Sequence, residues 1–535
     1  MSDWKHAFSI SQEEIKTATP PGTVVLVVGD ESKSISHEHG HGHGHGHGHG
    51  GAHIRFPKPS QDAADPLNWP IWRKHAVLLV LSLYSFIANF SASNIAPALQ
   101  MWPLFFPQDI RPFPVLSRLI AVTVLLIGGA NIWWVPLSNI IGHRPVLLSS
   151  LLILTLADLW CGLATNYDSL LAARIFQGIG AAAADTVAPA IIGEVYFVDE
   201  RGRALAIYTL FLATGSIVGG LSGGNIAAQY GWSYIFWIDL GIAAGTLLLT
   251  FFLVPETLYD RSSALLVTEV SAEASDDAVG QTSRPYTFGR SLGFRKPRGN
   301  VLFHFTNPWR VLALPGTWVV TLQYGGLVGG IVTISTIGPQ LLAMPPYLWG
   351  NNVGLINVGA LIGTVLGCVY TYLVSDARLK ASVSHQHQSH RYVEPESRLP
   401  TMFPSLAIAT AGFLVFGFCA QNPGPLVWVG LEFGHGMIAF GLMQAPSIGF
   451  SYLIDAYSYL AADCFVIAAI LRAIVGFAWS FFVAEWVQNR GAAEPFGIFA
   501  LLMGVFSLLT IPLWLYGKRL RIATSHRFEA TKANW

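Results

Sequence analysis

Twelve apolar stretches of about 20 residues constrain this chain more than any other feature. They lie at 75–98, 116–139, 146–165, 169–193, 203–229, 232–254, 311–340, 350–374, 401–421, 425–454, 459–487 and 494–517. A helix needs about 20 residues to cross the roughly 30 Å hydrocarbon core of a bilayer. Within that core only helices and closed barrels satisfy every backbone polar group. The stretches therefore predict an all-α membrane protein with twelve transmembrane helices.

The composition fits a surface that faces lipid. Hydrophobic residues make up 52% of the chain and charged residues only 12%, whereas a soluble domain carries about 25% charge. The 31 basic and 31 acidic residues balance, so no net field favours a nucleic-acid partner. The spans contain no nucleophile elbow or catalytic metal pair, and we expect neither an enzyme nor a bound cofactor. The four cysteines have no metal or disulfide spacing and are predicted to be packing residues; they are Cys161, Cys368, Cys419 and Cys464.

Charged segments divide the spans and orient them. A polar segment at 255–310 separates two six-helix halves at 71–254 and 311–517, with tails at 1–70 and 518–535. Lys and Arg concentrate in alternate loops, in this segment and after the last span. Because basic loops stay in the cytosol, we predict a multi-pass protein of the plasma membrane with both termini cytosolic.

The N-terminal tail contains an alternating His-Gly repeat at 37–53. Such a sequence has too little apolar surface to fold, so the tail is predicted to be disordered. Its imidazoles, for example those of His41, His43 and His45, could bind zinc, copper or nickel loosely. The alternative interpretation is a low-complexity tail without a specific metal function, and no metal site is predicted within the helices.

The connection between the second and third spans reads Asn139-Ile-Ile-Gly142-His143-Arg144. It resembles the signature loop of the major facilitator superfamily, in which an Asp and an Arg form a charge network that latches the outward-facing state. Gly142 and Arg144 match, whereas Asn139 replaces the usual Asp and His143 a usual Arg. The resemblance implies a weakened latch that responds to pH through His143. Asp376 and Arg378 stand where the second half would repeat it.

The fourth span contains Arg174-Ile-Phe-Gln177-Gly178, which resembles the Arg-x-x-Gln-Gly motif of the same superfamily. At 100° per residue, Arg174, Gln177 and Asp185 share one helix face. An arginine within a membrane helix is costly and marks a functional candidate, and the resemblance implies a role in proton coupling. The alternative is a structural arginine that is bound to backbone carbonyls or to Asp158 on the third span.

Further motifs resemble the fungal twelve-helix drug–proton antiporters of this superfamily, a branch that includes a yeast histidinol and polyamine permease. They are Glu200-Arg201-Gly202 after the fourth span and Pro395-Glu396-Ser397-Arg398-Leu399 before the ninth. On the fifth span, Gly220 replaces the proline of the family's antiporter motif. That replacement weakens the inference of antiport.

Polar residues within the other spans provide the remaining candidates. Glu432 and His435 lie three residues apart, on one helix face, and could share a proton; alternatively, Glu432 is solvated near the outer interface. The predicted proton-coupling residues are Arg174, Asp185, Glu432 and Asp158. The predicted cavity residues are aromatic, amide and imidazole side chains: Asn89, Asn131, Trp133, Gln177, Gln323, Tyr324, Asn357, His435 and Gln444.

The resemblance implies a major facilitator fold, with two six-helix bundles around a central pathway that opens alternately to each side. It implies a monomer whose partners are a small organic molecule, protons and the bilayer. Three functions remain open: proton-driven efflux of a drug, toxin or secondary metabolite; proton-coupled uptake of an organic cation such as a polyamine; and a non-transporting sensor or metal-handling protein.

Overall fold

A computed structural model describes residues 64–259, 301–389, 394–457 and 460–532, together with a few positions before residue 64. Within these residues, twelve helical segments are long and apolar enough to cross a membrane. They coincide with the twelve predicted stretches to within a few residues at most ends, and the described residues contain no strand. The all-α prediction and the number of spans are therefore confirmed.

The first half contains six membrane-crossing segments. Their elements are α3 (Ile71–Ser93) with η3 (Ala96–Met101) and α4 (Trp102–Phe105), α5 (Phe113–Leu116) with α6 (Arg118–Gly129) and α7 (Asn131–Ile141), α8 (His143–Leu163), α9 (Tyr167–Ala181) with α10 (Ala183–Val195), α11 (Val198–Tyr230) and α12 (Trp232–Leu253). The end of α3 has a clear cause, since Pro97 has no N–H to donate to the carbonyl of Ser93.

The second half repeats this plan after a short helix, α15 (Val301–Arg310). Its elements are η4 (Val311–Ala313), α16 (Pro315–Ala343), η5 (Gly350–Asn357), α17 (Val358–Ser389), η6 (Pro395–Met402), α18 (Phe403–Gln421), α19 (Trp428–Leu442), η7 (Ala445–Gly449), α20 (Phe450–Tyr457), α21 (Ala461–Arg490), α22 (Ala493–Leu508) and α23 (Thr510–Lys532). The tenth segment therefore passes through a π-helical turn, η7, between α19 and α20.

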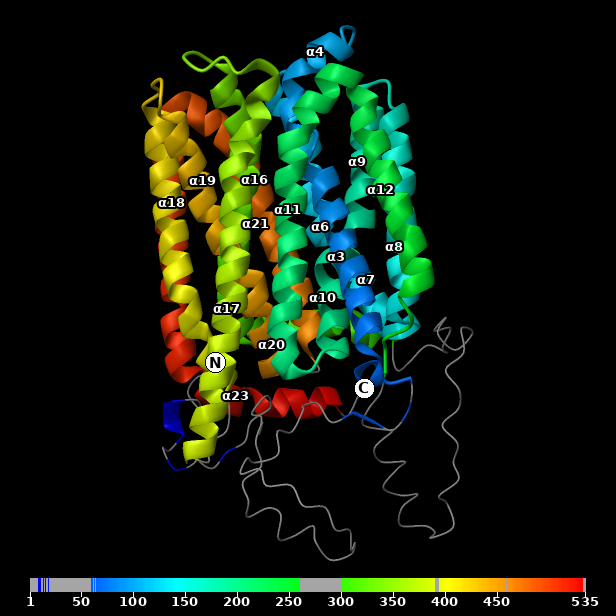
Figure 1. The fold of residues 1–535 in the computed structure, drawn as a ribbon, viewed down its shortest axis with the longest axis vertical. Helices are drawn as coiled ribbons and strands as arrows, with labels where there is room; N and C mark the ends of the chain where they lie inside the picture. The colour runs from blue at the N-terminus through cyan, green and yellow to red at the C-terminus, as the bar shows by residue number, and fades with distance from the viewer. Residues whose placement is uncertain are drawn as a thin grey trace, which may run out of the picture.

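The two halves stand side by side (Figure 1), the first in blue to green and the second in yellow-green to red. They meet where α11 packs against α17 and where α6 packs against α21. We call the end of the molecule where α3 begins and α23 lies the α23 end. Counted along the chain from one to twelve, the odd-numbered membrane-crossing segments begin at this end and the even-numbered ones finish there.

Two polar segments contain more structure than the sequence predicts. The predicted loop at 255–310 includes α15, which packs against α7 and α21. The predicted tail at 1–70 is folded near its end, where the buried side chain of Asp65 accepts the Leu67 N–H at 3.1 Å and caps a short 3-10 helix. The His-Gly repeat, including His41, His43 and His45, lies outside the described residues.

Gly142 makes the tight turn between α7 and α8 possible. Its φ of 112° lies in a region that side chains rarely adopt, and a Cβ there would collide with the carboxylate of Glu256. We expect Gly142→Ala to lower the free energy of unfolding by about 1–2 kcal/mol. Thermal unfolding of the purified protein in detergent would measure the loss.

Gly241→Ala is the matched control for this substitution. Gly241 lies within α12, and a Cβ there would meet open space. Because alanine favours a helix over glycine by about 1 kcal/mol, this variant should unfold at the wild-type temperature or above it. Equal unfolding temperatures for the two variants would contradict the role assigned to Gly142.

Candidate functional site

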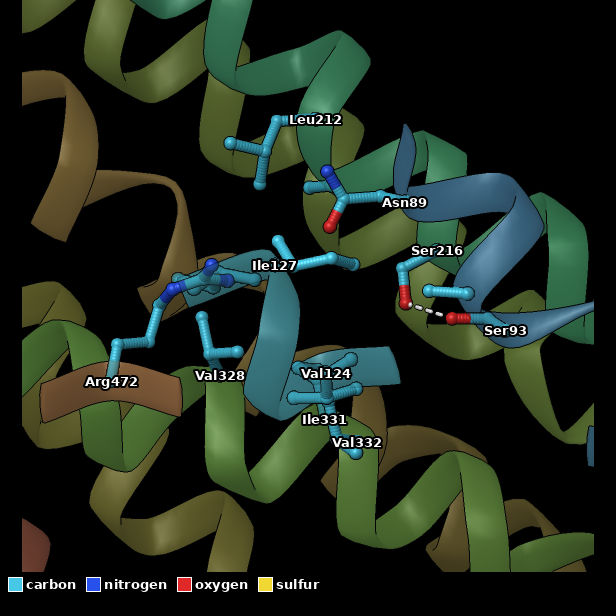
Figure 2. A pocket seen from close by; sticks show the side chains of 13 residues that line it. Asn89, Ser93, Val124, Ile127, Leu212, Ser216, Val328, Ile331, Val332 and Arg472 are labelled. Carbon is cyan, nitrogen blue, oxygen red and sulfur yellow. Dashed lines mark hydrogen bonds between the residues drawn. The ribbon is translucent and has the colours of Figure 1, made fainter. Parts of the chain in front are cut away.

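A small cavity lies between the two halves near the middle of the bundle (Figure 2). Its volume is about 30 Å³, close to the volume that one water occupies in the liquid. The wall is mainly apolar and is formed by Asn89, Ala92, Ser93, Val124, Ile127, Leu212, Ala213, Ser216, Val328, Ile331, Val332, Leu442 and Arg472. In this structure this cavity is therefore too small for a drug-sized molecule.

Polar groups reach this cavity from opposite walls. Ser93 on α3 and Ser216 on α11 are hydrogen-bonded to each other at 2.8 Å. Figure 2 shows this pair on one side and the Arg472 guanidinium of α21 on the other. Asn89 donates its amide N–H to the Ser85 carbonyl at 3.0 Å, which keeps this side chain in the wall. The cavity therefore combines an apolar lining with a few fixed polar groups, as small-molecule sites usually do.

A buried ion pair joins the two halves beside the cavity. Asp185 on α10 binds the guanidinium of Arg472 on α21, and both side chains are almost fully buried. The guanidinium also lies 5.2 Å from the ring centre of Tyr324. Breaking such a pair by removing one partner typically costs 3–5 kcal/mol. Asp185 was predicted from its helix face, whereas Arg472 was missed as a site residue although an arginine within a membrane span was the available signal.

Arg174 does not reach the cavity. Its guanidinium donates to the carbonyls of Ser91 and Ala92 on α3 at 2.6 and 2.9 Å, and to the side chain of Gln177 at 2.5 Å. Gln177 in turn donates to Asp158 on α8 at 2.5 Å. These contacts match the interpretation of a carbonyl-bound structural arginine, and they lie within the first half. Proton coupling by Arg174 or Asp158 stays a prediction.

Of the nine predicted cavity residues, only Asn89 is among the described lining residues. The Trp133 side chain is 62% exposed and packs against Phe305, so a cavity role for Trp133 stays a prediction. Tyr324 lies behind Arg472, and Gln177 belongs to the Arg174 contacts described above.

The remaining amides connect neighbouring helices. Asn131 accepts a hydrogen bond from Thr186 at 2.5 Å, Gln323 donates to Thr510 at 2.5 Å, and Gln444 donates to Thr371 at 2.8 Å. The Asn357 side chain accepts a hydrogen bond from Ser335 at 3.4 Å and packs against Gly220 on α11. A polar side chain within a span often satisfies a neighbouring helix, and the sequence pattern does not distinguish that use from a cavity.

Glu432 and His435 each contact a different backbone group, and proton sharing between them stays a prediction. Glu432 accepts the N–H of Gly359 at 2.5 Å, and His435 contacts the carbonyl of Ile356 at 3.0 Å through Nδ1. Both side chains therefore turn to the start of α17 and bind different backbone groups. Their spacing placed them correctly on one face, but that face packs against another helix.

The residues of the predicted latch that the structure describes make contacts within the first half. Glu256, which follows α12, accepts the backbone N–H groups of His143 and Arg144 at 2.9 and 3.2 Å. The Arg144 guanidinium donates to the carbonyl of Phe251 at 2.6 Å, and Asn139 is buried near the end of α7. These contacts brace the turn at Gly142. The side chains of Asp376 and Arg378 lie outside the described residues.

A second ion pair across the two halves involves Asp455, at the end of α20. Its carboxylate binds Arg201 of α11, in the first half, at 2.8 Å and also Arg398 of η6, in its own half, at 3.0 Å. The Arg201 and Asp455 side chains are only 5% and 6% exposed. Asp455 was not predicted as a site residue, although it is an isolated acid next to a short loop that carries no Lys or Arg. This arrangement joins the halves at the α23 end.

A second charged cluster at this end attaches α23 to η6. Arg521 binds Glu396 at 2.8 Å and Glu394 at 2.6 Å, and Lys518 binds Glu394 at 2.8 Å. Burial opposes ionisation of Glu394, but the bond from Lys518 and the charge of Arg521 outweigh it and hold the pKa of this carboxyl below its usual range. The cluster lies within the second half and does not bridge the two.

Two six-helix halves that meet around a central cavity, with ion pairs joining them, define the architecture of a secondary transporter. A family model described as Major Facilitator Superfamily matches residues 81–457. The chain belongs to this superfamily, and it is a membrane transporter rather than an enzyme.

Similar proteins agree with this assignment. An uncharacterized MFS-type transporter of Schizosaccharomyces pombe is 25% identical, and the alignment covers 95% of this chain and 94% of the relative. A probable efflux pump, mfs2, of Aspergillus flavus is 26% identical over 72% of this chain and 89% of its own. The solved structure of the proton:xylose symporter XylE aligns with a TM-score of 0.59 at 15% identity, over 83% of this chain and 96% of its own. That likeness concerns the fold alone.

We expect Asp455→Asn to loosen the α23 end, because it leaves Arg201 and Arg398 without their shared carboxylate. A cost of about 3–5 kcal/mol is large enough to shift a two-state equilibrium. Spin labels at Ile207 on α11 and Leu373 on α17, both exposed, would report it. In a background without the native cysteines, the distance between the labels should lengthen or its distribution should broaden.

Asp109→Asn is the control for this measurement. Asp109 pairs with Arg111 at the opposite end of the bundle, so its loss should leave the label distances at the α23 end unchanged. An Asp455→Asn protein with the wild-type distance distribution would show that these ion pairs do not hold the halves together.

Proposed function

We propose that this chain exports a small amphipathic organic compound in exchange for protons, by alternating access between its two halves. The observation that supports this proposal is the Asp185–Arg472 ion pair, which joins the halves at the wall of the central cavity. If Asp185 takes up a proton, Arg472 loses its charged partner. Arg472 can then bind substrate, or it can move with the second half when the two halves separate. Proton uptake at Asp185 and movement of the halves would then be coupled.

The chemistry of the cavity favours a neutral or anionic substrate. Its described lining contains one guanidinium, two serines and one amide among apolar side chains, and no carboxylate. The acids that an organic cation would need are occupied, since Asp185 binds Arg472 and Glu432 accepts the Gly359 N–H. An apolar body with an electron-rich group fits this wall better than a polyamine does.

The energy available from protons is sufficient for export. One proton that enters at a membrane potential of 100 mV supplies about 2.3 kcal/mol. Since about 1.4 kcal/mol corresponds to a tenfold ratio, one proton supports a gradient of roughly fifty-fold before any pH difference is counted. The efflux-pump name of the Aspergillus flavus relative supports the same direction.

Uptake of an organic cation is the second candidate. It is favoured by α11, which runs unbroken from Val198 to Tyr230 and has Gly220 at the position of the antiporter proline. Gly220 packs closely against Asn357, so this crossing of α11 with the second half differs from the kinked one that the antiporter motif implies.

We further propose that the protein works as a monomer in the plasma membrane, with the α23 end in the cytosol.

Transport by the protein reconstituted into vesicles with an internal pH-sensitive dye tests both candidates. Sets of compounds that share one apolar scaffold would be offered to the vesicles. In each set, one member carries a carboxylate, one carries an ammonium group and one is neutral. Under the export proposal, the neutral or carboxylate member should drive proton movement in the opposite direction. Proton movement in the same direction, driven by the ammonium member, would establish cation uptake instead.

Asp185→Asn should reduce proton movement driven by substrate at least tenfold, because the amide cannot carry the proton. Asp109→Asn, which removes a half-buried carboxylate paired with Arg111 at the opposite end of the bundle from α23, should retain wild-type coupling. Wild-type coupling in Asp185→Asn would refute the assignment of Asp185 as the coupling acid.

A further inference from the structure

A second pair of acids lies inside the first half, away from the ion pair with Arg472. Asp158 on α8 and Asp239 on α12 are both fully buried, on two helices that pack against each other. Their carboxylates are close enough to interact electrostatically. Asp239 was not among the predicted site residues, although an aspartate inside an apolar span was a signal for one.

The charges around these two acids do not balance. Arg174 is the one basic side chain among the described groups that interact with them. The other neighbours are uncharged: Gln177 donates to Asp158 at 2.5 Å, Asn94 donates to Asp239 at 2.6 Å, and the buried thiol of Cys161 lies nearby. Two carboxylates and one guanidinium would leave a net charge of −1 in a dry interior, which is very costly.

The hydrogen bonding around the two acids also lacks a proton, because buried acceptor oxygens there have no donor. Each carboxylate uses one oxygen to accept an amide N–H, and its second oxygen, Oδ2 of Asp158 and Oδ1 of Asp239, is buried without a partner. The Asn94 side-chain oxygen, next to the N–H that binds Asp239, is also buried without a partner. These three buried acceptors lack a donor, whereas buried acceptors are normally paired.

We propose that Asp158 and Asp239 form a proton-binding site that holds one proton, so that only one of the two carboxyl groups is ionised at a time. One proton would bring the charge of the cluster to zero and would turn one carboxylate into a donor. Carboxylates that interact in a dry interior do not readily ionise together, so such a pair can retain one proton at neutral pH. Along the length of the helices, the site lies nearer to the end of the bundle opposite the α23 end.

Arg174 connects this site to the cavity wall. Its guanidinium donates to the carbonyls of Ser91 and Ala92, and Ala92 and Ser93 line the cavity. When this proton leaves, the second negative charge draws Arg174 towards the acids and away from these α3 carbonyls. Occupancy of the site is therefore linked to the shape of the cavity, and this link rests on the proposed transport function, whereas the proton site itself does not.

Infrared spectroscopy of the purified protein tests the site without substrate or transport. Protein labelled with ¹³C at the aspartate side-chain carboxyl would be measured at neutral pH, where we expect the carbonyl stretch of a protonated aspartic acid. Asp158→Asn and Asp239→Asn should each abolish completely the part of this band that comes from the Asp158–Asp239 site. After either change, the remaining carboxylate balances Arg174 and stays ionised.

Controls separate this result from other acids and from the proposed function. Asp109→Asn, which removes an acid paired with Arg111, should leave the band unchanged, and so should Asp185→Asn, even where Asp185→Asn abolishes coupled transport. Loss of the band in only one of the two cluster variants would show that one acid holds the proton independently of the other and would overturn the proposal. If a variant does not fold, the labelled wild-type protein still decides, because the absence of a protonated aspartic acid band would refute the site.

Discussion

The cost of placing charge in a dry interior governs how this molecule is organised. A buried ion is tolerated only when partners nearby compensate for its lost hydration. Asp185 and Arg472 meet this condition across the two halves, and Asp455 meets it with Arg201 and Arg398 at the α23 end. The Asp185–Arg472 and Arg201–Asp455 pairs are satisfied only while the halves are in contact at those points, whereas Arg398 and Asp455 belong to the same half. Movement of one half against the other must therefore exchange these partners for protons, water or substrate.

Polar residues within the halves have a different role. Asn131, Gln323 and Gln444 each bind a neighbouring helix of their own half, and Glu256 braces the turn at Gly142. These contacts do not depend on how the halves are arranged, so each half can move as a unit. The division between contacts within and across the halves is what rocking motion around a central cavity requires.

The sequence was sufficient for the fold and insufficient for the site. Span length and the cost of unpaired backbone groups in lipid are local properties, so the twelve helices could be predicted. Helical spacing shows which residues share a face but not which helix covers that face, so the sequence could not show that Glu432 and His435 contact different backbone groups at the start of α17. For the same reason it could not show that the Trp133 side chain packs against Phe305. Asp455 and Asp239 owe their importance to partners more than a hundred positions away in the chain, which no local pattern reveals.

The two acid sites differ in what their charge can report. The Asp185–Arg472 pair is neutral when closed, and its partners belong to different halves, so its protonation depends on the conformation of the transporter. Asp158, Asp239 and Arg174 all belong to the first half, so rocking leaves their charge imbalance intact. A change within that half, for example at the α3 carbonyls bound by Arg174, would alter their environment. Under the two proposals, a proton at the first site would therefore respond to which way the transporter faces, and a proton at the second would respond to the shape of the cavity wall.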